Sequence, residues 1–217
     1  MCTIYFIRHG ETIWNIERRM QGHKNSNLTD FGIEQMKWAA DALKNIKFEK
    51  LYTSDLERAL QSAEIFKRIF SSDNLCIEKN SLLREINLGS WEGRKIEDVS
   101  VEDPESYRAF WQSPELDSRK DGESLLDIIS RSGQFLKLME ANHNNQTVAA
   151  VSHALFIKAA SAWIANKNIA DFWSGEKIKP GSITVAEYEN SEWKLLDEGN
   201  IAHYKSENSQ ATWFVGK

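Results

Sequence analysis

Short apolar segments alternate with helical segments along this chain, and this alternation constrains its fold more than any other feature. Residues rich in β-branched and aromatic side chains form five predicted strands, at 3–7, 48–53, 75–77, 147–151 and 182–187. Helical periodicity marks residues 29–43, 54–70 and 154–165 and a segment that begins at Ser124. The pattern predicts an α/β fold, a three-layer α/β/α sandwich with a mostly parallel central sheet.

Two finer features concern particular segments. The run Ser54-Asp55-Leu56-Glu57 matches a capping box and predicts a helix that begins there. Residues 94–122 are the least regular part of the chain, with two prolines and a group of three aromatic residues. Such segments often cover active sites, and a plain surface excursion is the equal alternative. We expect one domain, residues 1–217, with 94–122 as a variable cap-like segment.

Composition excludes several classes of function. The 217 residues carry a formal charge of -5 and no basic run, which argues against a nucleic-acid partner. Cys2 and Cys76 are too few for a disulfide framework and lack metal-type spacing. No apolar stretch approaches the ~20 residues of a membrane span, and the N-terminus does not resemble a signal peptide. A cytoplasmic location without membrane contact is expected, and the sequence carries no signal for an oligomeric state.

Charged residues stand at four junctions where a predicted strand ends. Arg8 and His9 follow the first strand, and Arg58 lies just beyond the second. Glu85 follows the third strand, and His153 follows the fourth. Because the ligands of α/β sheets bind where strands end, these five side chains are expected to meet at one edge of the sheet.

Such a set of side chains suits a phosphoryl group. A phosphoryl group in transfer carries negative charge on its oxygens, and fixed positive charge stabilises it. Arg8 and Arg58 supply forked donors of permanent charge, and a protonated His153 would add a third cation.

The reacting groups are then a histidine and a carboxyl group. His9 is assigned as the neutral nucleophile, because Gly10 beside it would let a substrate approach closely and the arginines disfavour its protonation. Glu85 would protonate the departing alcohol oxygen and then take a proton from the attacking water. The other histidines, His23, His143 and His203, are interpreted as surface or loop residues.

Ordered motifs extend this set along most of the chain. The first group is Arg8-His9-Gly10-Glu11-Thr12, Trp14-Asn15, Gln21-Gly22, Leu28-Thr29 and Gly32. The later groups are residues 53–59, Ser62-Ala63, residues 83–93, Gly122-Glu123-Ser124 and Val151-Ser152-His153. Together they resemble the signature of the histidine phosphatase superfamily, also called the phosphoglycerate mutase-like family. Any one of these residues alone would more often be structural, and the ordered set is what favours catalysis.

The resemblance implies a role for each matching residue. His9 is implied as the phosphohistidine nucleophile, Glu85 as the proton donor, and Arg8, Arg58 and His153 as the phosphate pocket. The remaining candidates for substrate binding are Asn15, Gln21, Gly22 and Ala154. Ala154 stands where many members have glycine, which affects one backbone contact. The chemistry needs no metal and no cofactor.

The resemblance favours a phosphatase that hydrolyses a small phosphorylated metabolite. The first alternative is a cofactor-dependent phosphoglycerate mutase, which needs more positive charge than the Ile86-Asn87-Leu88-Gly89 run supplies, although Arg119 and Lys120 could partly substitute. The second is a non-catalytic module that binds a phosphorylated ligand. As a hypothesis, Tyr107, Phe110 and Trp111 form part of a lid over a substrate with some apolar body.

Overall fold

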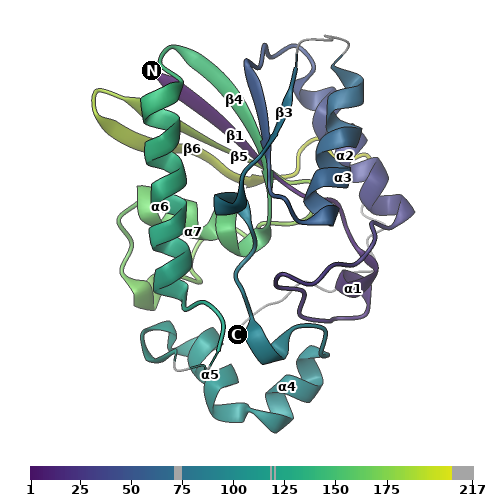
Figure 1. The fold of residues 1–217 in the computed structure, drawn as a ribbon, viewed down its shortest axis with the longest axis vertical. Helices are drawn as coiled ribbons and strands as arrows, with labels where there is room; N and C mark the ends of the chain where they lie inside the picture. Colours follow the sequence, from purple (N-terminus) through teal and green to yellow (C-terminus); the bar gives the residue numbers. More distant parts are fainter. Residues whose placement is uncertain (71–74, 118, 120, 207–217) are drawn as a thin grey trace.

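The computed structural model describes residues 1–70, 75–117, 119 and 121–206, and it has the predicted α/β sandwich architecture (Figure 1). Within these residues, six strands form one sheet in the order β3-β2-β4-β1-β5-β6. The strands are β1 (Cys2–Arg8), β2 (Lys50–Thr53), β3 (Ile77–Lys79), β4 (Gln146–Ser152), β5 (Ile183–Glu189) and β6 (Glu192–Asn200). The first four are parallel, and β5 and β6 continue the sheet antiparallel, so the prediction of a mostly parallel sheet is confirmed.

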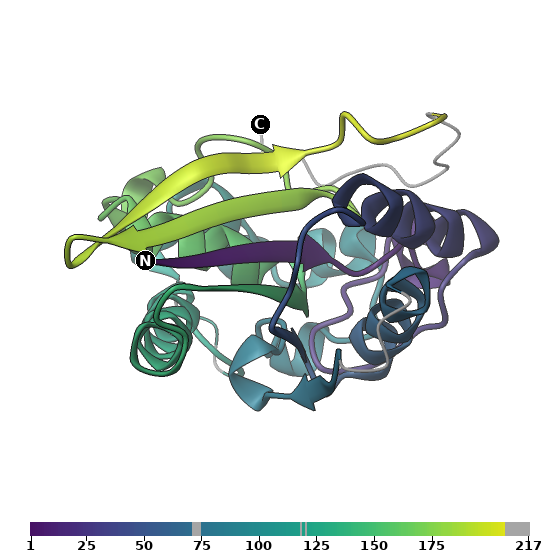
Figure 2. The ribbon, with the colours of Figure 1, turned by 90° about the horizontal axis from the view of Figure 1, so that it is seen from above.

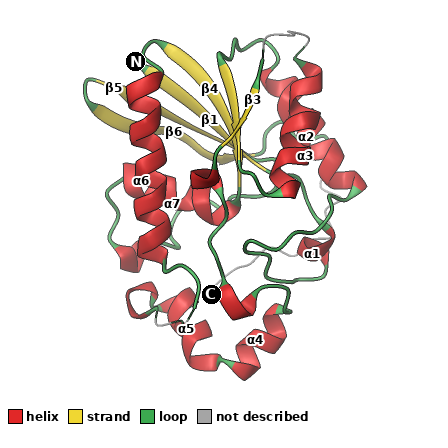
Figure 3. Ribbon diagram, viewed as in Figure 1, coloured by secondary structure: helices red, strands yellow, loops and turns green. Residues whose placement is uncertain are grey.

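Helices cover both faces of the sheet. The described α-helices are α1 (Ile13–Ile16), α2 (Asp30–Leu43), α3 (Glu57–Ile69), α4 (Ile96–Glu102), α5 (Pro104–Gln112), α6 (Leu125–Asn142) and α7 (Ala154–Ile164). The pair α2 and α3 packs on one face, and α6 and α7 pack on the other (Figures 1 and 3). In Figure 2 the purple strand β1 lies between the green β4 and the yellow-green β5.

The central strands are apolar on both sides, as a sheet between two helical layers requires. Along β1, Ile4 and Phe6 join the core beneath α6 and α7, whereas Ile7 joins the core beneath α2 and α3. Successive residues of a strand point to opposite faces, so an unbroken apolar run supplies both cores. The ring of Phe6 lies 6.2 Å from that of Phe135 and 6.3 Å from that of Phe156, which ties the sheet to both helices of its layer.

One prediction of detail is wrong, and two segments differ in character from what their sequence suggests. Helix α3 begins at Glu57 after Leu56 as its N-cap, and the Ser54 hydroxyl accepts from the Leu56 N–H, so the capping box is not formed. The segment 94–122, the least regular part of the chain by sequence, contains the short helices α4 and α5, and Pro104 occupies the first turn of α5, where proline needs no hydrogen-bond donor. His143 follows α6 as a loop residue, within its prediction as a surface or loop residue, and it is buried with its Nε2 atom 2.8 Å from the Tyr52 hydroxyl.

The predicted chemical residues lie at one end of the sheet. Arg8 ends β1, Ser152 ends β4, and the two are register partners of the parallel pair. Helices α4 and α5 lie beyond this end of the strands (Figures 1 and 3). Among the residues that the structure describes, no helix has the length and apolar character needed to traverse a membrane.

Helix α6 offers a matched test of this packing. Leu136 is fully buried, whereas Leu126 on the same helix is 62% exposed. We expect Leu136→Ala to lower the free energy of unfolding by about 2–5 kcal/mol, because it removes buried methyl groups and leaves a cavity. The control Leu126→Ala should change it by about 0.5 kcal/mol or less. Urea unfolding followed by circular dichroism measures both, and equal effects of the two variants would contradict the assigned face of α6.

Candidate active site

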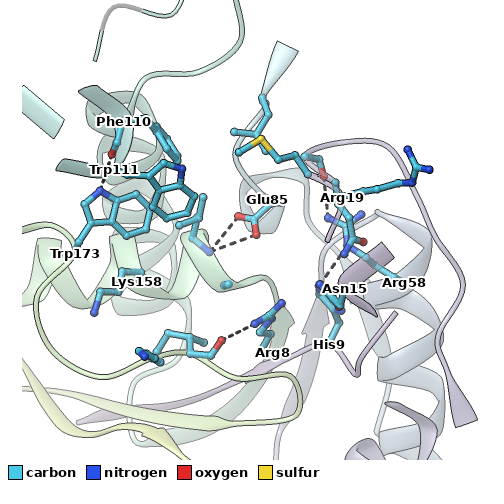
Figure 4. A pocket seen from close by; sticks show the side chains of 18 of the residues that line it. Arg8, His9, Asn15, Arg19, Arg58, Glu85, Phe110, Trp111, Lys158 and Trp173 are labelled. Atoms are coloured by element: carbon cyan, nitrogen blue, oxygen red, sulfur yellow. Dashed lines mark hydrogen bonds between the residues drawn. The ribbon is translucent and has the colours of Figure 1, made fainter. Parts of the chain in front are cut away.

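A cavity of about 200 Å³ opens at the end of the sheet where β1 and β4 terminate. Its lining includes eight of the nine residues predicted for the site: Arg8, His9, Asn15, Gln21, Gly22, Arg58, Glu85 and Ala154. The ninth, His153, is fully buried directly beside His9, with the two ring centroids 5.1 Å apart. Residues spread over some two thirds of the sequence are therefore brought together around one space (Figure 4).

The hydrogen bonds of His9 define which of its ring nitrogens can react. Nδ1 lies 2.7 Å from the carbonyl oxygen of Gly10. A carbonyl can only accept, so Nδ1 carries the proton and Nε2 keeps its lone pair. Arg58 Nε donates to that Nε2 at 3.3 Å. The lone pair of His9 thus lies beside a guanidinium group in the pocket, where the oxygens of a phosphate would bind.

Gly10 has a different role from the one predicted. A Cβ atom at this position would overlap the carbonyl group of Gly32, at the start of α2. The glycine therefore permits two backbone segments to touch, rather than making room for a substrate. Its N–H donates to the Ser62 hydroxyl at 3.2 Å, which in turn donates to the Arg58 carbonyl at 2.7 Å. These contacts fix the loop after β1 against α3.

Both histidines are held in the neutral form. Burial lowers the pKa of His9 well below its ordinary value of 6.5, and the charges of Arg58 and Arg8 lower it further. Burial likewise lowers the pKa of His153, with Arg58 as the next cause. Neither ring nitrogen of His153 has a hydrogen-bond partner among the described residues. The third cation expected at His153 is therefore absent until an anion arrives to stabilise it.

Two arginines supply the positive charge. Arg58, in the first turn of α3, is 1% exposed, and its terminal nitrogens donate to the carbonyls of Lys24 and Gly22 at 2.8 Å each. Arg8 donates to the carbonyl of Ile178 at 2.7 Å. Burial lowers the pKa of each arginine to about 10, which still leaves both charged at neutral pH. These hydrogen bonds go to neutral carbonyls, while the negative charge of Glu85 acts on both arginines and partly opposes the lowering of their pKa values.

The carboxyl group of Glu85 faces the same cavity (Figure 4). It accepts from the N–H of Ile86 at 3.0 Å and from the N–H of Leu155, in the first turn of α7, at 3.2 Å. These bonds orient the carboxyl group, which is nearly buried at 9% exposure. A carboxyl group oriented in this way is placed to exchange a proton with a ligand atom in the cavity.

The polar residues of the loop before α2 form one wall of the pocket. The Oδ1 atom of Asn15 accepts from the N–H and the hydroxyl of Thr12, both at 3.0 Å, so the NH₂ end of Asn15 is the end that can serve a ligand. Gln21 donates from Nε2 to the Thr12 hydroxyl at 2.8 Å. Gly22 has a φ of +52°, and a Cβ there would overlap the carboxylate of Glu92.

Sequence reasoning missed the residues that hold Glu85 in position. Arg131 of α6 donates to the carbonyls of Leu82 at 2.7 Å, Arg84 at 2.8 Å and Glu85 at 3.2 Å. Its guanidinium also pairs with the carboxylate of Glu123 at 2.7 Å. Glu123 belongs to the Gly122-Glu123-Ser124 motif, so the sequence did single it out. Arg131 stands in the middle of a helix, where an arginine is typical of a solvent-exposed charge, and its sequence context did not indicate a role at the site.

His23 was interpreted as a surface or loop residue, yet it also contacts the segment that bears Glu85. Its Nε2 atom lies 2.9 Å from the Glu85 carbonyl, and its N–H donates to Glu92 at 2.8 Å. The side chain is half-buried between the two loops. His23 therefore joins the loop before α2 to the loop that carries the carboxyl group.

Aromatic side chains form the other side of the pocket. Phe110 and Trp111 of α5 line it as the lid hypothesis predicts, but Tyr107 does not and packs instead against Trp91 and Trp111. Trp173, which sequence reasoning missed, completes the group, with its ring centroid 4.4 Å from that of Trp111.

Comparison with known proteins agrees with this arrangement. The model of the histidine phosphatase superfamily (branch 1) matches residues 4–201. Phosphoserine phosphatase 1 of Hydrogenobacter thermophilus is 31% identical over 174 residues, which cover 80% of this chain and 81% of the relative. The probable phosphoglycerate mutase GpmB of Shigella boydii is 30% identical over 211 residues, covering 94% of this chain and 95% of that protein.

A solved structure extends the similarity to the whole fold. Bacillus stearothermophilus YhfR superposes with a TM-score of 0.89 at 32% identity, over 94% of this chain and 99% of that one. The fold is phosphoglycerate mutase-like, and the family model spans the strands and helices that build the pocket. The chain belongs to the histidine phosphatase superfamily.

Proposed function

We propose that this protein is a phosphomonoester phosphatase that hydrolyses a small phosphorylated metabolite through a phosphohistidine intermediate on His9. One observation carries the proposal: the neutral ring of His9 keeps the lone pair of Nε2 beside the guanidinium of Arg58 in the pocket. A nucleophile needs that lone pair, and a phosphate needs that charge. The relative named phosphoserine phosphatase 1 supports the same activity.

The reaction takes two steps. In the first, His9 Nε2 attacks phosphorus, the phosphorus–oxygen ester bond breaks, and Glu85 gives a proton to the departing oxygen, which leaves as an alcohol. In the second, water attacks the phosphohistidine and the phosphorus–nitrogen bond breaks. Glu85 takes a proton from that water, and inorganic phosphate leaves. Both the histidine and the carboxyl group return to their starting states.

The remaining residues hold the phosphoryl oxygens. Arg8 and Arg58 donate to them, and a bound phosphate dianion favours protonation of His153, whose ring then donates as well. Asn15 donates from its NH₂ end. Gln21, Gly22 and Ala154 border the same space, with Ala154 at the start of α7. Charge that is already fixed in place stabilises the transition state without reorganisation.

The distribution of cations favours a phosphatase over a mutase. A bisphosphate needs a second cluster of free positive charge. Arg119 is buried in a 2.9 Å ion pair with Asp117, and Lys120 lies outside the described residues. Arg19 pairs with Glu17 at 2.6 Å. The relative named as a probable phosphoglycerate mutase keeps the mutase as the second candidate.

A non-catalytic binding module is the least favoured candidate, because the nucleophile, the carboxyl group and both arginines line one cavity.

We also infer a cytoplasmic location from the two free thiols, Cys2 and Cys76. The partner of the site is a small phosphomonoester. In this proposal residues 1–217 form a single domain, and the segment 94–122 is the cap over the pocket.

Removal of the nucleophile tests the proposal directly. We expect His9→Ala to lower the rate of phosphate release from p-nitrophenyl phosphate by about a thousandfold or more, because it removes the ring nitrogen that forms the covalent intermediate. The p-nitrophenolate that is released together with phosphate is followed at 405 nm with purified protein. A matched control is His143→Gln, which removes a buried histidine at the end of α6, remote from the pocket, and should retain activity. Unchanged release in His9→Ala would refute the assignment of His9.

The charge state of the two histidines gives a second test. Because the pKa of each is lowered by burial, both rings should stay neutral at pH 5.5, where an ordinary imidazole with a pKa of about 6.5 is roughly 90% protonated. Ring ¹⁵N spectra of the free enzyme measure this, with His9→Ala used for assignment. We expect a neutral His9 with its proton on Nδ1; protonated signals from both rings at that pH would contradict the burial argument.

The same shifts affect stability. Unfolded chains take up protons on these histidines below about pH 6.5, whereas the folded protein does not. The contribution of His9 and His153 to stability is therefore complete above that pH and is lost as the pH falls below it.

The requirement for a bisphosphate separates the two activities. We expect 3-phosphoglycerate to yield inorganic phosphate without added 2,3-bisphosphoglycerate, since Arg119, a candidate for holding a second phosphate, is buried in its ion pair with Asp117. Phosphate assay and ³¹P spectra of the same reaction distinguish hydrolysis from conversion to 2-phosphoglycerate. Conversion that strongly requires the bisphosphate would overturn the phosphatase assignment.

A further inference from the structure

The half of the pocket away from His9 is built from aromatic rings. Phe110, Trp111 and Trp173 stand together on this side, whereas His9 and Arg58 stand on the other (Figure 4). Phe110 and Trp111 come from α5, and Trp173 comes from the loop after α7. We call these three side chains the aromatic wall. The pocket thus has one charged half and one apolar half.

The aromatic wall is held rigidly. Trp173 Nε1 donates to the Phe110 carbonyl at 2.7 Å, which fixes the loop after α7 to α5. The guanidinium of Arg119 lies 4.5 Å from the centre of the Phe110 ring and 5.4 Å from that of Trp91. Its ion pair with Asp117 is almost fully buried. Rings held in this way offer a preformed surface, and a ligand that packs on them loses little to reordering.

Two lysines contribute to the pocket lining near the aromatic wall. Lys158 contributes its alkyl stem, while its amine points away from Glu85 and donates to the carbonyls of Ser174 at 2.5 Å and Glu176 at 2.9 Å (Figure 4). Lys177 is exposed to solvent at the rim, where its charge is screened. The aromatic wall itself therefore offers an apolar surface rather than a site for a second anionic group.

Glu85 lies between the two halves of the pocket (Figure 4). In the proposed reaction this carboxyl group reaches the ester oxygen, so the phosphoryl group lies on the His9 side of it. The alcohol part of the substrate must then extend from the ester oxygen toward the aromatic wall. Recognition of the substrate beyond its phosphate therefore takes place at the aromatic wall.

Resting on the proposed phosphatase function, we propose that the substrates of this enzyme are phosphomonoesters whose alcohol part carries a flat aromatic ring, which packs against Trp111 and Trp173. Aromatic pairs in offset or edge-to-face contact gain free energy beyond the burial of apolar area. The wall supplies such contacts at the place where the alcohol part lies. Small polar alcohols such as glycerol leave it unfilled.

Three primary alkyl phosphates test this class with similar leaving groups: 2-phenylethyl phosphate, 2-cyclohexylethyl phosphate and glycerol 1-phosphate. We expect kcat/KM to be highest for the phenyl compound, by about tenfold over the glycerol compound. Trp111→Leu and Trp173→Leu should each lower kcat/KM for the phenyl compound by about fivefold to tenfold and change that for glycerol 1-phosphate less than about twofold.

A remote tryptophan supplies the control. Trp193 of β6 is half-buried and donates to Glu140 at 2.6 Å, far from the pocket lining, so Trp193→Leu should leave the substrate ratio unchanged. Thermal melting of each variant identifies loss of folding, which lowers activity on all three substrates alike.

Two results would overturn the proposed class: equal kcat/KM for the phenyl and cyclohexyl compounds, or equal losses on the phenyl and glycerol compounds in both well-folded Trp111→Leu and Trp173→Leu. Failure of the phosphatase function itself looks different. In that case none of the three compounds releases phosphate, or His9→Ala releases it as fast as the wild-type protein.

Discussion

The pairing of β1 with β4 is the constraint on which the site depends. These parallel strands end together, Arg8 opposite Ser152, and the N–H of His9 donates to the Ser152 carbonyl at 2.9 Å. The two histidines that follow are thereby set 5.1 Å apart. A shift of one residue in this register would send Arg8 and the apolar residues of β1 to the opposite faces of the sheet. Both strands are apolar on both sides because the two cores require it, and this pattern sets their register. The same register sets the positions of Arg8 and of the two histidines.

Burial of the two histidines, together with the charges of the two buried arginines, explains why both rings are neutral. Taking Arg8 and Arg58 out of water costs free energy, and carbonyl oxygens of Ile178, Lys24 and Gly22 offset part of that cost without adding negative charge. The positive potential of the arginines adds to the effect of the histidines' own burial and helps to keep both imidazoles neutral. A phosphate therefore binds where its negative charge compensates the positive charge of the buried arginines. The nucleophile stays unprotonated until the phosphate binds.

The fold and most residues that line the pocket could be predicted from local patterns in the sequence, whereas the residues that hold the pocket in shape could not. Strand positions and the residues after strand ends are set by short-range periodicity, which is why His9, Glu85 and Arg58 could be placed at one edge of the sheet from sequence. Trp173 and Arg131 act through contacts between segments distant in sequence, and nothing in their neighbours announces this. The Ser54 capping box failed for a related reason: α3 begins two residues later than the motif suggests, with Leu56 as its N-cap, and the N–H of Arg58 in its first turn donates to Asn25 of a distant segment.

The aromatic wall and the carboxyl group are not independent. Arg119 packs on the Phe110 ring and donates to the Glu123 carbonyl, and the Glu123 carboxylate pairs with Arg131. Arg131 in turn holds the carbonyl of Glu85. A continuous chain of hydrogen bonds and ring contacts therefore joins the aromatic wall to the segment that bears the proton donor. A substrate that packs on this preformed wall is thereby held in a fixed position relative to the carboxyl group of Glu85, and such positioning lowers the entropic cost of the chemical step.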